Sequence, residues 1–121
     1  MNIKKQILKR RPMIQFNRAL SMLDKNMMEI EKKIFYLKLT TLLKRYLSLK
    51  IGIKIESLTT REVEHILSDS DLNKDIVKDI VVFLSFADRV KFQGYEPTLN
   101  DMHVHMDKMG KFITDIEGSY A

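Results

Sequence analysis

The segment Asp101–Asp107, Asp-Met-His-Val-His-Met-Asp, holds the side chains whose types and spacing come closest to a metal site. On a helix, His103 and His105 point about 200° apart, so they cannot bind one ion together. Asp101 and His105 have the i,i+4 spacing that places two ligands on one face. The same spacing separates His103 from Asp107, yet each pair is only half of the ligand set that zinc requires. We therefore predict no metal site, and we expect exposed polar positions here.

No other side chains suggest catalysis. His65 follows Glu64, and a histidine beside a carboxylate can act as a base, but neither a nucleophile nor a third orienting group accompanies the pair. The chain has no cysteine, and its four glycines are isolated, so it has neither a thiol nucleophile nor a glycine-rich phosphate loop. We therefore predict that the protein is not an enzyme and uses no cofactor.

The net charge of +5 is distributed unevenly along the chain. Five cations stand near the N-terminus without an acid: Lys4, Lys5, Lys9, Arg10 and Arg11. Residues 32–54 hold seven cations and no acid, whereas residues 56–117 hold 13 acids against seven cations, a balance of −6. The basic tip would suit an anionic membrane surface or a nucleic acid, and the alternative is a solvated, flexible end.

A nucleic-acid-binding module that uses the basic N-terminus and the second predicted helix is the alternative function. The third and fourth predicted helices could mimic a helix-turn-helix, but phosphates would be repelled by the acids at the start of its recognition helix, Asp69, Asp71, Asp75 and Asp79. The apolar runs are far shorter than the roughly 20 residues of a membrane span, and no signal peptide is visible. We therefore expect a cytoplasmic protein, held at the inner face of the membrane if the basic tip binds lipid.

Hydrophobic spacing predicts an all-α fold, a compact bundle of about five helices. Residues 1–11 are expected to be a flexible basic segment and residues 12–118 a single helical domain. The expected helices are Pro12–Met28, Glu31–Lys50, Thr59–Leu67, Leu72–Arg89, and a last one that starts within Thr98–Asp101 and ends at Gly118. Gly52 should end the second helix. Thr59 and Glu62 form a capping box, and Ser70 or Asp71 should cap the fourth helix.

The segment Ala87–Pro97 carries aromatic and charged residues between two helices, so we predict an ordered connector there. The side chains expected to pack inward are Val90, Phe92 and Tyr95. The side chains expected at its rim are Asp88, Arg89 and Lys91. Gly94 supplies a backbone conformation that other residues resist, and Pro97 ends the connector before the last helix.

A partner is expected to bind the rim of this connector together with the second helix. The predicted partner-binding residues are Lys44, Arg45, Arg89, Lys91 and Tyr95, and the alternative for Lys91 is a structural pair with Asp88. The residues expected to have structural roles are Tyr46, Gly52, Thr59, Glu62, Phe92, Gly94 and Pro97. Three methionines of the last helix, Met102, Met106 and Met109, could form an adaptable partner groove, but we predict that they fill the core.

Three landmarks follow one another in order between Leu37 and Ile116. They are Leu42-Leu43-Lys44-Arg45-Tyr46-Leu47 with Gly52, then Leu58-Thr59-Thr60-Arg61-Glu62, then Ala87-Asp88-Arg89-Val90-Lys91-Phe92 with Tyr95-Glu96-Pro97. In this order they resemble the small cytoplasmic helical domain encoded in Bat (aerotolerance) operons with MoxR-type AAA+ ATPases and von Willebrand factor A proteins. The family pattern has a Leu-Leu-Arg-Arg-Tyr-Leu helix, a Leu-Thr-Thr-Glu-Glu helix start and a Cys-Asp-Leu-Val-Lys-Phe-Ala connector.

The chain departs from this family pattern in places. Arg89 stands where the family usually has an apolar residue, and Gln93-Gly94 stands where alanine is common. Family members usually carry a membrane helix ahead of the domain, so we expect this chain to be a soluble fragment or a member without the anchor. The resemblance implies an accessory or scaffolding role near the inner membrane, through contacts with MoxR-type ATPases and von Willebrand factor A proteins.

Overall fold

The computed structural model describes residues 3–119, with side chains from residue 12 onward, and within this range the chain forms helices and turns without a strand. The elements are α1 (Ile3–Lys25), the short 3₁₀ helix η1 (Met27–Glu29), α2 (Lys32–Ile51), α3 (Thr60–Ser68), α4 (Lys74–Phe92) and α5 (Leu99–Ser119). The prediction of an all-α bundle of about five helices is therefore confirmed.

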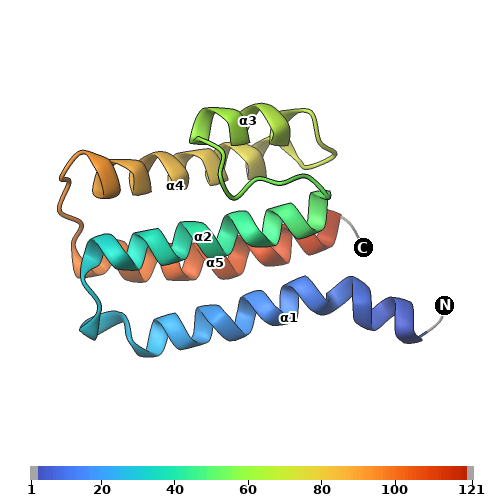
Figure 1. The fold of residues 1–121 in the computed structure, drawn as a ribbon, viewed down its shortest axis with the longest axis horizontal. Helices are drawn as coiled ribbons and strands as arrows, with labels where there is room; N and C mark the ends of the chain where they lie inside the picture. Colours follow the sequence, from blue (N-terminus) through green and yellow to red (C-terminus); the bar gives the residue numbers. More distant parts are fainter. Residues whose placement is uncertain (1–2, 120–121) are drawn as a thin grey trace.

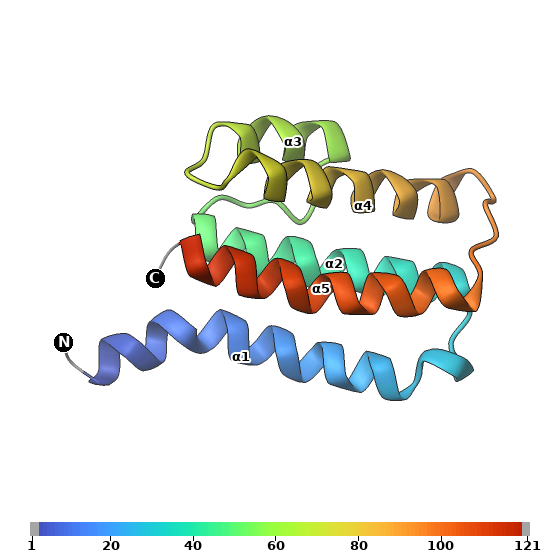
Figure 2. The ribbon, with the colours of Figure 1, turned by 180° about the vertical axis from the view of Figure 1, so that it is seen from behind.

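The four long helices α1, α2, α4 and α5 form an up-and-down bundle (Figure 1). Both α1 and α4 pack against α2 and against α5. As a result, α2 and α5 lie in the middle of the molecule with α1 on one side and α4 on the other, as Figures 1 and 2 show from opposite sides. The short helix α3 belongs to the connection from α2 to α4 and packs against α4.

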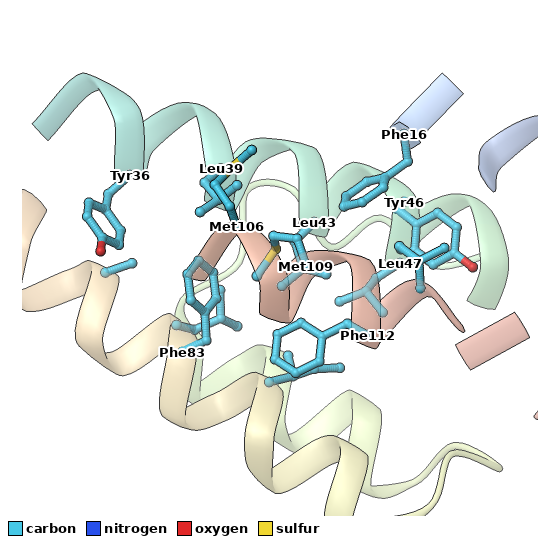
Figure 3. Close-up of a cluster of buried hydrophobic side chains, with 14 of the residues drawn as sticks. Phe16, Tyr36, Leu39, Leu43, Tyr46, Leu47, Phe83, Met106, Met109 and Phe112 are labelled. Carbon is cyan, nitrogen blue, oxygen red and sulfur yellow. The ribbon is translucent and has the colours of Figure 1, made fainter. Parts of the chain in front are cut away.

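Side chains from all four long helices meet in one core. Ten of these side chains are labelled in Figure 3: Phe16, Tyr36, Leu39, Leu43, Tyr46, Leu47, Phe83, Met106, Met109 and Phe112. Met102, Met106 and Met109 are all buried, which confirms that the methionine seam belongs to the core. Tyr46 is buried as predicted, and its hydroxyl donates a hydrogen bond to Glu117 Oε2 at 2.7 Å.

The end of α2 and the start of α3 are formed by the residues predicted for them, Gly52 and Thr59. Gly52 follows α2 with φ +81°, in the left-handed region that favours glycine, and its N–H donates to the Ser48 carbonyl. Thr59 caps α3 by accepting from the Glu62 N–H at 3.2 Å, while the Glu62 carboxylate accepts from the Thr59 N–H at 3.0 Å. This reciprocal pair is the capping box that the sequence predicts.

The predicted start of α4 is wrong. Asn73 caps this helix, with its side-chain oxygen accepting from the Asp75 N–H at 2.7 Å. Ser70, one of the two predicted caps, instead accepts from the Leu72 N–H at 3.2 Å and so shapes the turn before the helix. Leu72 lies in this turn and is buried there, so its apolar side chain belongs to the core without belonging to the helix.

The predicted bounds of the first helix are also wrong. α1 begins at Ile3, so Pro12 lies inside the helix and not in its first turn. Lysine, glutamine, leucine and arginine dominate residues 3–11, and these are good helix formers. Residues 1–2 and the side chains of the basic tip lie outside the described part of the chain, so the flexibility expected of residues 1–11 stays a prediction.

Candidate functional site

The histidine cluster of α5 divides between the core and the surface. His103 is exposed as predicted, but His105 is only 7% exposed, so the expectation of an exposed position is wrong for it. The reason is helical phase, because His105 lies three residues after Met102 and four before Met109 on the buried face. Its Nδ1 lies 2.6 Å from the hydroxyl oxygen of Tyr36.

Aromatic rings surround His105 and control its charge. Its ring centroid lies 4.5 Å from that of Phe86 and 5.2 Å from that of Phe83. Burial lowers the pKa of His105 to about 4, with a further lowering by Lys108 that Asp101 partly opposes. The imidazole is therefore neutral at pH 7, and it acts as a polar member of the core.

Within residues 12–119, no three histidine or acidic side chains are placed to share a metal ion. His65 is exposed, and its Nε2 lies 3.8 Å from Asp69 Oδ2 on the surface of α3. Glu64 is exposed as well, so the Glu64–His65 pair has no enclosed environment for catalysis.

Lys91 is buried, not at the rim where we expected it to meet a partner. It is 9% exposed, and its Nζ donates to Thr40 Oγ1 at 3.3 Å and lies 3.7 Å from Asp88 Oδ1. Asp88 also accepts a hydrogen bond of 2.6 Å from the Thr60 hydroxyl. Since the last turn of α4 faces α2 and α3, Lys91 and Asp88 tie these three helices together, so Lys91 is a structural residue.

Phe92 is the main error of the sequence prediction, because the structure leaves it 76% exposed. α4 extends to Phe92, and a helical residue points about 100° away from its neighbour. With Val90 and Lys91 turned inward, Phe92 is turned outward to solvent. Tyr95 was also expected to pack inward and is instead exposed, with its ring 5.3 Å edge-on from the ring of Phe86.

Arg89 joins Phe86 and Tyr95 into one surface, and the exposed Phe92 lies three residues further along α4. Its guanidinium lies 5.2 Å from the ring centroid of Phe86 and 5.2 Å from that of Tyr95. We call the residues Phe86, Arg89, Phe92 and Tyr95 the connector patch. Among the described side chains, no carboxylate pairs with Arg89, so its charge is available to a partner.

The backbone around the connector patch is held firmly. Gly94 adopts φ +69°, and the N–H of Tyr95 donates to the Arg89 carbonyl at 3.1 Å. Pro97 is buried, and its carbonyl accepts a hydrogen bond of 2.7 Å from Lys32 Nζ at the start of α2. The predicted roles of Gly94 and Pro97 in an ordered connector therefore have a visible basis.

The structure does not bring the five predicted partner-binding residues onto one surface. Arg89 and Tyr95 adjoin, but Lys44 is half-buried and donates to the Leu58 carbonyl at 2.7 Å. Burial lowers the pKa of Lys44, and the nearby charge of Lys91 lowers it further. Arg45 is exposed on another face of α2, where its Nε lies 3.6 Å from Glu56 Oε1.

Several cations of α2 are paired with acids elsewhere in the chain. Lys32 Nζ lies 3.8 Å from Glu96 Oε2. Lys50 forms an ion pair with Glu117 of α5. These contacts reduce the positive potential that a nucleic acid would meet along this helix.

Phe86 is the member of the connector patch that sequence reasoning missed. Phe86 is half-buried, with its ring packed against the core and beside Arg89. It belongs to a run of apolar residues in α4, and such a run does not show from the sequence which members also reach the surface. The usable signal was the spacing from Phe86 to Arg89, because residues three apart are neighbours on a helix.

Comparison with known protein families, curated protein sequences and solved structures finds no match to this chain. Within residues 3–119, none of the helices is long and apolar enough to cross a membrane.

Proposed function

We propose that this chain is a non-enzymatic interaction module, an accessory or scaffolding protein that binds a protein partner through the connector patch. The observation that carries the proposal is the exposed phenyl ring of Phe92 at the C-terminal end of α4, where Arg89 and, in the following connector, Tyr95 are also exposed. Aromatic residues and arginine are the side chains most enriched among those that dominate binding energy at protein interfaces.

The rigidity of the patch supports this role. Arg89 lies against the rings of Phe86 and Tyr95, which also contact each other, and the connector is anchored by its hydrogen bonds to α2 and α4. Side chains already held in place lose less conformational entropy when a partner binds. The free charge of Arg89 specifies a partner that presents a carboxylate beside an apolar side chain.

The proposed class of partner comes from the resemblance to the Bat operon domain. We propose a MoxR-type AAA+ ATPase or a von Willebrand factor A protein, with the chain acting on the cytoplasmic side of the membrane. The resemblance rests on the three landmarks in the sequence, and the third of them runs through Arg89, Phe92 and Tyr95 of the patch.

The test is binding of the purified chain to purified MoxR-type ATPase and von Willebrand factor A proteins of the same organism, measured by calorimetry. We expect Phe92→Ser and Arg89→Glu each to weaken binding, since both side chains are exposed and their loss leaves the core intact. The matched control is Val104→Ser on α5, which removes an apolar side chain of 41% exposure outside the patch. Equal binding by all three variants would overturn the proposal, as would the absence of binding to both protein classes.

A further inference from the structure

A groove of about 490 Å³ runs between α1 and α2, away from the connector patch. Its apolar wall includes Ala19, Met22 and Leu23 of α1 with Leu37 and Leu42 of α2. It shares no lining residue with the patch, and it lies on the outer side of the two helices whose inner sides form the core.

The apolar side chains at the mouth of the groove are exposed to an unusual degree. Met22 is 61% exposed and Leu37 is 49% exposed. The core positions of α2, such as Phe35 and Leu39, lie on its other face, so Leu37 is out of phase with them. A flexible methionine beside leucines is a surface that can adapt to an incoming apolar side chain.

The charged groups that line the groove have one sign. They are Lys38 and Arg45, and no acid is among the lining residues. Lys38 has no ion pair within the described part of the chain, and Arg45 meets Glu56 through one contact of 3.6 Å between half-exposed side chains. Such a pair contributes little and can be exchanged for another carboxylate. Because seven residues separate the two cations, they lie about 10 Å apart along α2.

We propose that this groove binds one amphipathic helix of a partner protein, which inserts an apolar stripe between α1 and α2 and places two carboxylates, about two turns apart, against Lys38 and Arg45. A helix laid in a groove between two helices is an established mode of recognition. The concave shape of the groove favours a helix as its occupant. A lipid surface would instead contact an apolar face that protrudes from the protein. Because the charged residues that line the groove, Lys38 and Arg45, are both positive, the partner segment should be acidic.

The probe is a displayed library of helical peptides, about 15 residues long, with leucines fixed at i, i+3 and i+7 and the other positions varied. The library is selected on the full chain and counter-selected on the Leu37→Ser variant, whose core is unchanged because Leu37 is exposed. We expect enriched peptides to carry aspartate or glutamate seven residues apart beside the leucines. No enrichment over the Leu37→Ser variant, or enrichment of basic peptides, would overturn the proposal.

Charge reversal provides the second measurement on the selected peptides. Lys38→Glu should weaken their binding about tenfold, and replacing the facing peptide carboxylate by lysine should restore it. Val104→Ser should leave binding unchanged. Sedimentation and vesicle binding test the other occupants: a dimer, or adhesion to phosphatidylglycerol vesicles, that Leu37→Ser abolishes would assign the groove to a second copy or to lipid and would refute a partner helix. Since Phe92→Ser should not affect these peptides, this proposal and the connector patch can fail separately.

Discussion

Lowering the pH from about 7 to about 4.5 should destabilise this protein through one side chain, His105. In the unfolded chain the ring has its ordinary pKa of 6.5, whereas burial among aromatic rings lowers the folded value to about 4. Between these two values the unfolded state binds a proton that the folded state does not. Stability is therefore complete above about pH 6.5 and is lost as the pH falls toward 4.

The size of the effect follows from the same two pKa values. The gap between 6.5 and about 4 corresponds to roughly 3 kcal/mol, at about 1.4 kcal/mol for each pH unit. Between pH 7 and pH 4.5, where the transition is incomplete, about 2 kcal/mol of the free energy of unfolding should disappear. Urea unfolding followed by circular dichroism at several pH values measures this loss directly.

Carboxylates also begin to titrate in this range, so the test needs a matched variant. In the neutral tautomer that carries its proton on Nε2, Nδ1 of His105 accepts the Tyr36 hydroxyl proton across 2.6 Å. The double variant Tyr36→Phe, His105→Phe removes both members of this bond and leaves no unpaired polar atom. Its stability should change less than that of the wild type over the same pH interval, by about 2 kcal/mol. Parallel pH profiles, or an NMR titration of His105 in the folded protein near pH 6.5, would refute the reasoning.

Three further predictions concern stability at neutral pH, each measured by urea unfolding. Phe83→Ala should cost about 3–5 kcal/mol because Phe83 is buried, while Phe92→Ser should stay within about 0.5 kcal/mol because that ring is exposed; similar losses would contradict the burial of one and the exposure of the other. Thr59→Ala should cost about 1 kcal/mol and let the pKa of Glu62, which the Thr59 hydrogen bonds lower, rise toward its ordinary value. Gly52→Ala should cost about 1 kcal/mol through its φ of +81° alone, since an added Cβ meets no atom within 4 Å; an unchanged stability would show that the helix end relaxes.

The sequence predicted the five helices and the end signals of α2 and α3, because these depend on neighbours in the chain. Gly52 and the Thr59–Glu62 pair act within a few residues of themselves, so local chemistry was enough. The start of α1 was missed because proline disfavours a helix interior and favours the first turn, so Pro12 indicated a boundary, whereas the helix continues through it.

The candidate site was harder to predict because it depends on which way each side chain faces. The pair of Lys91 with Asp88 was open as an alternative because the two residues are three apart, but the burial of Lys91 against Thr40 of α2 depends on a residue 51 positions away. Phe92 was assigned to the core by its hydrophobicity, yet α4 ends with its ring turned to solvent. His105 was assigned to the surface, and Tyr36, whose hydroxyl lies 2.6 Å from its Nδ1, is 69 positions away in the sequence. A one-dimensional pattern does not contain these pairings.

Both proposed surfaces arise from helices that are apolar on two faces. α2 buries Phe35 inward and exposes Leu37 outward, and α4 buries Phe83 and exposes Phe92. A helix that only had to fold would need one apolar face, since the second adds exposed hydrophobic area and a tendency to aggregate. In each case the outward apolar residues adjoin a cation that can accept an acidic group, Lys38 in the groove and Arg89 in the connector patch. The physical reason for the second face is therefore best sought in acidic, apolar protein partners.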